Sequence, residues 1–101
     1  MQLDIRGHGL ALTPSLLDHV ACRIHFALGR FDGWVRRVTV RVADVNGPRG
    51  GVDKRCHLRV DVAGRPVTIE ELDADLYAAI DRAAERAGRA ARRTLARVRA
   101  A

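Results

Sequence analysis

Apolar and polar residues alternate along four stretches of the chain, and a period of two is typical of β-strands with one buried face. The first stretch is short and covers residues 2–6, with Leu3 and Ile5 on its apolar side. The other three, residues 34–43, 54–62 and 67–71, follow one another closely. Their apolar positions, which we expect to face the core, are Val38, Val40, Val42, Cys56, Leu58, Val60, Val62, Val67 and Ile69.

Two further stretches follow the period of an amphipathic α-helix. The first begins at Thr13-Pro14, a suitable N-cap and first helical residue, and ends near Gly29 and Asp32-Gly33. Its apolar positions are Leu17, Val20, Ala21, Ile24, Leu28 and Phe31. The second covers residues 73–99, with Asp73 as the expected N-cap and Leu72 and Tyr77 as a hydrophobic staple. Its apolar positions are Leu76, Ile80, Ala83, Ala87, Ala91 and Val98.

The order of elements is therefore β-α-β-β-β-α, in one domain over residues 1–101. Three consecutive strands with short connections predict an antiparallel meander, and the first strand should pair in parallel with the second across the helical connection. Two helices on one face of a four-stranded sheet make a two-layer α+β sandwich. The other sheet face should be exposed and would carry Arg6, Arg37, Arg41, Arg55 and Arg59.

The charge of the chain indicates an anionic partner. The formal net charge is +6 and the pI is near 10.9, which favours nucleic acid first and an acidic membrane surface second. Of 18 basic residues all except Lys54 are arginine, which is suited to bidentate contacts with phosphate. A genome rich in G+C would also favour arginine codons, so the bias alone does not decide between these explanations.

Arginines also recur along one face of the predicted second helix, at spacings of three and four residues. They are Arg82, Arg86, Arg89, Arg93 and Arg97. Asp81 and Glu85 are the acids among the arginines that follow Ile80, too few to pair with them all. We therefore expect this arginine line to contact RNA rather than to be a face of solvated ion pairs.

No group of residues indicates an enzyme, a metal site or a cofactor. Cys22 and Cys56 form no C-x-x-C motif, and no cysteine or histidine occurs at a metal-ligand spacing, so both cysteines should be reduced thiols. Residues 46–53 are rich in glycine, but they lack the Gly-Lys-Ser/Thr ending of a phosphate-binding loop and join two strands. We expect a hairpin loop there, with Arg49 and Lys54 making only a peripheral RNA contact.

The sequence contains neither a signal peptide nor a membrane-length apolar run. The expected location is therefore the cytoplasm, with no membrane partner and no small-molecule substrate.

Residues 75–81, Asp-Leu-Tyr-Ala-Ala-Ile-Asp, resemble a segment of the ribosome hibernation promoting factor family, also called ribosome-associated inhibitor A or protein Y. Its members carry D-x-Y-x-A-I-D at the start of their last helix, followed by basic residues. Thr13, residues 23–31 and the basic C-terminal part are also similar to that family. The resemblance spans nearly the whole chain, and it is to a short form without the second domain that lets long members pair ribosomes.

The resemblance implies the same fold, akin to a double-stranded-RNA-binding domain, and a role as a translation inhibitor. Family members bind in the decoding channel of the small ribosomal subunit, where messenger and transfer RNA would otherwise lie. They contact 16S rRNA through basic residues of both helices. Carried over to this chain, and with Arg97 added from the arginine line, those residues are Arg23, Arg30, Arg82, Arg86, Arg89, Arg92, Arg93 and Arg97.

A second class of function is compatible with the sequence. The chain would then be a protein-interaction or dimerisation module that uses a strand edge or the polar sheet face, with arginine serving solubility. The sequence leaves the oligomeric state open. Sedimentation with ribosomes at low and high salt would separate the two classes.

Overall fold

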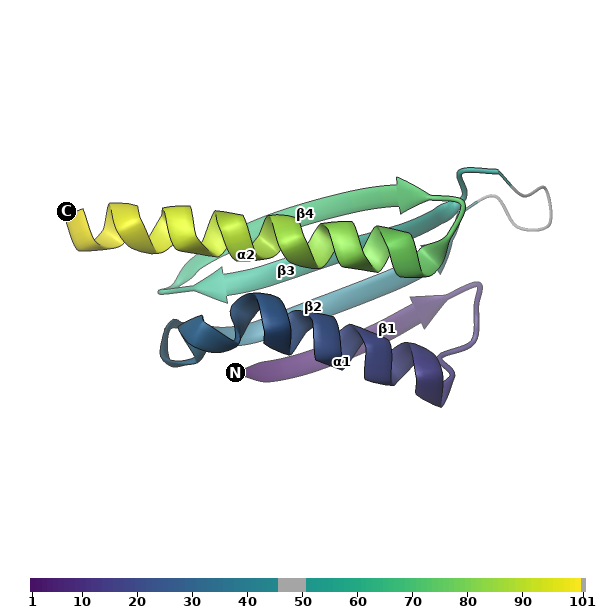
Figure 1. Cartoon of the computed structure of the whole chain (residues 1–101), viewed down its shortest axis with the longest axis horizontal. Coiled ribbons are helices and arrows are strands. Elements are labelled where there is room, and N and C mark those ends of the chain that lie inside the picture. Colours follow the sequence, from purple (N-terminus) through teal and green to yellow (C-terminus); the bar gives the residue numbers. More distant parts are fainter. Residues whose placement is uncertain (46–50, 101) are drawn as a thin grey trace.

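The computed structural model describes residues 1–45 and 51–100, and it has the predicted β-α-β-β-β-α order (Figure 1). Its elements are β1 (Gln2–His8), α1 (Pro14–Leu28), the 3-10 helix η1 (Gly29–Trp34), β2 (Val35–Asp44), β3 (Lys54–Val62), β4 (Arg65–Asp73) and α2 (Leu76–Ala100). The additional 3-10 helix η1 lies where the sequence predicted a turn. The predicted RNA contact Arg49 lies outside the described residues.

The four strands form one sheet in the order β1-β2-β3-β4. β1 pairs in parallel with β2, and the other two pairings are antiparallel. Both helices lie side by side over one face of this sheet, α1 over β1 and β2 and α2 over β3 and β4 (Figure 1). The two-layer α+β sandwich is therefore confirmed.

The strand register is the predicted one. Val38, Val40, Val42, Cys56, Leu58, Val60, Val62 and Ile69 are buried, and Val67 is partly buried. Arg41 and Arg59, their neighbours in sequence, are exposed on the opposite face. A slip of one residue would turn all of these side chains to the wrong face of the sheet. The alternation was therefore sufficient to predict which face the helices cover.

Helix α1 begins as predicted, since the Thr13 hydroxyl accepts a hydrogen bond from the Leu16 amide at 3.2 Å. Its fully buried residues are Leu16, Val20, Ile24 and Leu28, whereas Leu17 and Ala21 are partly buried. The buried line thus follows a spacing of four residues, one position away from the predicted Leu17.

Helix α2 begins at Leu76, and the prediction of Asp73 as its N-cap is wrong. The Asp75 carboxylate accepts from the Tyr77 amide at 2.9 Å instead, and Asp73 still pairs with Lys54 as the last residue of β4. Strand pairing holds Asp73 extended, so the helix starts later. Leu72 consequently does not precede the cap and is exposed.

Small residues bring α2 close to its neighbours. Six buried alanines of α2 face the core, together with Ile80 and Leu95; they are Ala79, Ala83, Ala84, Ala87, Ala90 and Ala91. At Gly88 the helix passes close to α1, because a Cβ placed there would lie 3.0 Å from the Ala27 carbonyl oxygen. The short distance between the helices allows side chains of both to line one groove.

The two cysteines should differ sharply in reactivity. Cys56 is buried in β3, and burial raises its pKa to about 12, whereas Cys22 is exposed on α1. Since the thiolate is the reactive form, a disulfide reagent such as dithionitrobenzoate should modify one thiol of the native protein quickly. The second should react only after unfolding in denaturant. Rapid reaction of two thiols in the native protein, or of any thiol in a Cys22→Ala variant, would contradict the buried position of Cys56.

Candidate nucleic-acid interface

A groove runs between α1 and α2 on their solvent side, and four arginines are among the residues that line it. It has a volume of about 340 Å³, with Arg23 and Arg30 on one side and Arg89 and Arg92 on the other. Its remaining lining residues are Phe26, Ala27, Ala84, Glu85 and Gly88. A second hollow, which shares Arg30 and Arg92, continues it to Arg99. We refer to both together as the interhelical groove.

Helical spacing explains why these arginines meet. Arg89, Arg92 and Arg99 lie three and seven residues apart on α2, so they share one side of the helix, which faces α1. Arg23 lies on α1 and Arg30 directly beyond its end in η1, seven residues later. Against these five guanidinium groups the groove has Glu85 as its acid, and Glu85 pairs with Arg89 at 2.7 Å. The groove therefore carries excess positive charge.

A polar contact holds the two helices together at one end of the groove. Asp81 Oδ1 on α2 lies 2.7 Å from His19 Nε2 and 3.2 Å from Arg23 Nε, both on α1. The Tyr77 ring stands edge-on to the His19 ring, with 4.7 Å between centroids. Together with the Asp75 cap, this gives Asp75, Tyr77 and Asp81 of the D-x-Y-x-A-I-D segment structural contacts that start α2 and position it against α1.

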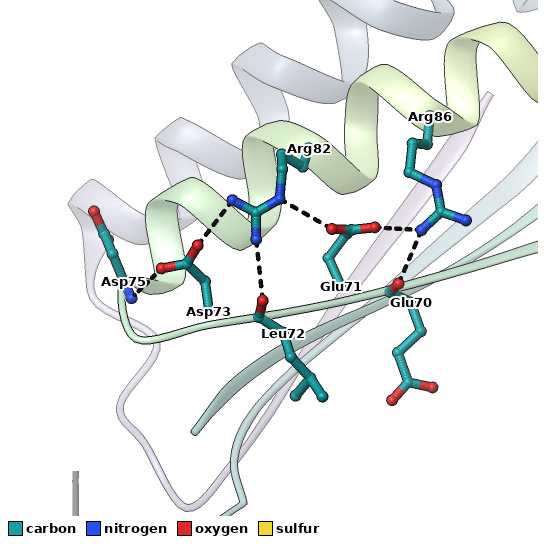
Figure 2. A network of polar contacts seen from close by, with 7 residues as sticks. All are labelled: Glu70, Glu71, Leu72, Asp73, Asp75, Arg82 and Arg86. Carbon is teal, nitrogen blue, oxygen red and sulfur yellow. Dashed lines mark hydrogen bonds and ion pairs between the residues drawn. The ribbon is translucent and has the colours of Figure 1, made fainter. Parts of the chain in front are cut away.

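Arg82 and Arg86 lie on the other side of α2 and face the edge strand β4 (Figure 2). Arg82 Nε lies 3.0 Å from Glu71 Oε1, and its Nη1 lies 2.8 Å from Asp73 Oδ2. Arg86 also pairs with the Glu71 carboxylate. These acidic partners lie 9 to 15 positions earlier on β4, so the acids within the helix sequence gave no sign of them.

The same two arginines cover backbone groups of the sheet edge. Arg82 Nη2 donates to the Leu72 carbonyl and Arg86 Nη1 to the Glu70 carbonyl, each at 3.0 Å (Figure 2). These carbonyls belong to alternate residues of β4, whose outer edge has no neighbouring strand in the described sheet. Free carbonyls on an edge strand are where another chain can add a strand. This part of β4 is therefore less available for the alternative function of strand-edge interaction.

The predicted arginine line is thus divided among different surroundings. Arg89 lines the groove, together with Arg92 from outside the line, and Arg82 and Arg86 bind β4. Arg93 and Arg97 are exposed, and within residues 1–45 and 51–100 neither forms an ion pair.

Lys54, predicted as a peripheral RNA contact, forms ion pairs within the protein. Its Nζ lies 2.8 Å from Asp53 Oδ1 and 3.5 Å from Asp44 Oδ2. The hydrogen bond with Asp53 raises the pKa of the ammonium group above its usual value. Phe26 and Arg99, which were not among the predicted RNA-binding residues, also line the groove. Phe26 had a signal, since it lies two positions from both Ile24 and Leu28 and so off the apolar face of α1.

Comparison with known proteins identifies the family. Residues 3–99 match the model of the family described as "Sigma 54 modulation protein / S30EA ribosomal protein". The chain belongs to this family. The description of this family includes a ribosomal protein, and membership supports the expectation that the chain is not an enzyme.

Individual relatives agree with this assignment. The chain is 27% identical over 93 residues to the ribosome hibernation promotion factor of Picosynechococcus sp., covering 92% of this chain and 48% of the relative. The chain thus spans about half the length of that curated relative. Its fold is similar to the crystal structure of the Thermus thermophilus protein Y N-terminal domain, with a TM-score of 0.78, 29% identity, and coverage of 93% of this chain and 99% of that one.

A ribosomal subunit interface protein from Coxiella burnetii shares the fold. Its TM-score is 0.79 at 14% identity, with coverage of 95% of this chain and 99% of that one.

Among the described residues, no group of three or more histidine, cysteine, aspartate or glutamate side chains could hold a metal ion. No helix in the described part of the chain is long and apolar enough to cross a membrane.

The β4 network of this S30EA-family chain should make its stability sensitive to acid. Hydrogen bonds from Arg82 and then Arg86 lower the pKa of Glu71 below its ordinary value of 4.5. A lowered folded-state pKa contributes stability above the unfolded-state pKa, and this contribution is lost as the pH falls through the folded-state value. Replacing Glu71 by glutamine should therefore reduce the free energy of unfolding by about 1 kcal/mol at neutral pH.

The difference between wild type and Glu71→Gln should begin to narrow as the pH falls below the ordinary pKa of 4.5, and it should disappear once the pH has fallen through the lowered folded-state pKa, where the wild-type carboxylate is protonated as well. Urea unfolding of both proteins at neutral pH and near pH 3 measures this. A difference that stays constant across this range would show that the Glu71 charge does not stabilise the fold.

Proposed function

We propose that residues 1–101 form a single ribosome-binding domain that contacts 16S rRNA of the small subunit through the interhelical groove. The observation that carries the proposal is that arginines from α1, η1 and α2 converge in one groove with a single acidic residue in its lining. RNA phosphates are the abundant anions that guanidinium groups bind well. Membership of a family described as ribosomal protein supports rRNA as the source of those phosphates.

The proposed effect is inhibition of translation during ribosome hibernation in the cytoplasm. A relative is named ribosome hibernation promotion factor, and this chain covers about half of it. Bound in the decoding channel, a rigid domain would exclude messenger and transfer RNA by occupying their space. The mechanism needs no bond to be made or broken; it needs shape and charge. Arg23, Arg30, Arg89 and Arg92 would hold the RNA backbone, with Arg93 and Arg97 beside the groove.

Sedimentation with purified ribosomal subunits tests this proposal. The protein should pellet with small subunits at low salt and be released as salt rises, because each neutralised phosphate releases counterions. Excess messenger and transfer RNA bound first should block it. Binding that is confined to large subunits, or that ignores salt, would overturn the proposal and favour the protein-interaction alternative.

A further inference from the structure

Phe26 is exposed in a way that folding does not explain. Its side chain is 82% exposed, the most exposed large apolar side chain in the described part of the protein. A phenylalanine on a helix surface adds nothing to the core and does not gain the stabilisation that burying such a side chain provides. The ring also does not stand alone, since the Arg23 guanidinium carbon lies 5.8 Å from its centroid.

The position of the ring within the groove points to a ligand. Phe26 lines the groove from the α1 side, between Arg23 and Arg30 in sequence, and Arg89 and Arg92 face it from α2. Ala27, Ala84 and Gly88, which carry no long side chains, also line the groove beside the ring. An aromatic face surrounded by guanidinium groups matches a ligand that has both a flat apolar ring and a phosphate.

We propose that Phe26 is a stacking platform for an unpaired nucleobase, so that the interhelical groove takes single-stranded RNA rather than a duplex. This rests on the proposed function and narrows it to a class of rRNA element: a loop, bulge or single-stranded segment. The base lies on the Phe26 ring, and Arg30, Arg89 and Arg92 bind the phosphates on either side.

Physical chemistry favours this ligand over others. Base faces are available for stacking only where a nucleotide is unpaired or splayed out, whereas a duplex presents its backbone and groove edges. Stacking on an aromatic side chain adds affinity without sequence preference, because every base has a π-face. An apolar protein segment would match Phe26 but would leave the arginines of the groove desolvated and unpaired, which is costly.

The experiment uses the full chain and a short RNA in which one base is replaced by a fluorescent adenine analogue that is quenched on stacking. The wild-type protein should bind the single strand, quench it, and bind the same RNA more weakly once it is annealed to its complement. Phe26→Leu keeps an apolar side chain of similar size but removes the π-face. It should lose the quenching and roughly five- to hundredfold in affinity, while Phe26→Tyr and Phe26→Trp retain both.

Two controls make the result specific. The slope of affinity against salt should be the same in wild type and Phe26→Leu, because no charge has changed. Since Phe26 is exposed, the unfolding transition should also stay where it is. Equal affinity and quenching in Phe26→Leu, equal binding of duplex and single strand, or no binding of the single strand overturns the inference.

Binding to ribosomal subunits distinguishes a failure of the stacking inference from a failure of the proposed function. If wild-type protein binds small subunits and Phe26→Leu binds them equally well, the groove is an RNA site without a stacking platform. If wild-type protein does not bind small subunits at all, the ribosomal proposal itself is wrong, whatever the short RNA shows.

Discussion

Replacing Arg30 and Arg92 together by glutamate is expected to lower the affinity for small ribosomal subunits on the order of a hundredfold or more. The two residues face each other across the interhelical groove and line both of its hollows. The change removes two phosphate contacts and places two negative charges next to the negatively charged RNA backbone. The slope of log affinity against log salt should flatten by about 1.4 to 1.8, the contribution of two phosphates.

Sedimentation or fluorescence anisotropy over a range of salt concentrations measures both effects. The fold should survive, because both side chains are exposed and neither forms an ion pair within the described residues. Such positions usually change the free energy of unfolding by no more than about 0.5 kcal/mol. Circular dichroism and thermal unfolding of the variant verify this.

A matched control comes from the opposite side of the molecule. Arg6 and Arg41 are paired neighbours of β1 and β2 on the uncovered sheet face, and both are exposed. Replacing them by glutamate changes the net charge by the same amount, so it removes general attraction without touching the groove. The control should bind much better than the groove variant. If it loses binding while the groove variant keeps it, the RNA surface is the sheet face.

The local pattern was sufficient to predict the sheet, because the alternation of apolar and polar residues within each strand shows which of its faces is buried. In β3 the alternation of Cys56, Leu58 and Val60 with polar residues leaves one possible buried face. The same logic failed at the start of α2, where both Asp73 and Asp75 are good caps. The choice is made by the pairing of Asp73 with Lys54 across two strands, which is a contact between residues distant in sequence.

The candidate site was predictable in composition but not in arrangement. Periodicity grouped Arg82, Arg86 and Arg89 on one helix face, yet the first two bind Glu71 on β4. Nothing in the helix itself indicates that partner. Arg92, which the periodicity left out and only the family resemblance supplied, is central to the groove because α1 packs on that side. The packing of the two helices therefore decides which guanidinium groups are available.

Gly88 is the residue on which that packing depends, and Gly88→Val is expected to destabilise the fold by about 1–3 kcal/mol. A Cβ at this position would lie 3.0 Å from the Ala27 carbonyl oxygen and 3.4 Å from the Ala27 Cβ. The first of these is a backbone atom of α1, so relief requires a movement of the helix and not of a flexible side chain. With about 4–8 °C for each kcal/mol in a domain of this size, the melting temperature should fall measurably.

The stability control for Gly88→Val is Ala96→Val, at an exposed position on the same helix that lines the second hollow but lies away from Ala27. It introduces the same β-branched side chain, with its modest cost in helix propensity, but no contact with Ala27. Thermal or urea unfolding should rank wild type and Ala96→Val close together and Gly88→Val well below. Because valine has a higher helix propensity than glycine, a Gly88→Val protein at least as stable as wild type would show that α1 yields without cost.

Binding provides the second measurement on Gly88→Val. At a temperature where this variant is still folded, its affinity for small subunits should also fall, although no charge has been removed. Pushing α1 away from α2 separates Arg23 and Arg30 from Arg89 and Arg92, so one RNA segment can no longer contact both sets. Full affinity in a folded Gly88→Val protein would mean that the arginines bind independently, as scattered charges rather than as one groove.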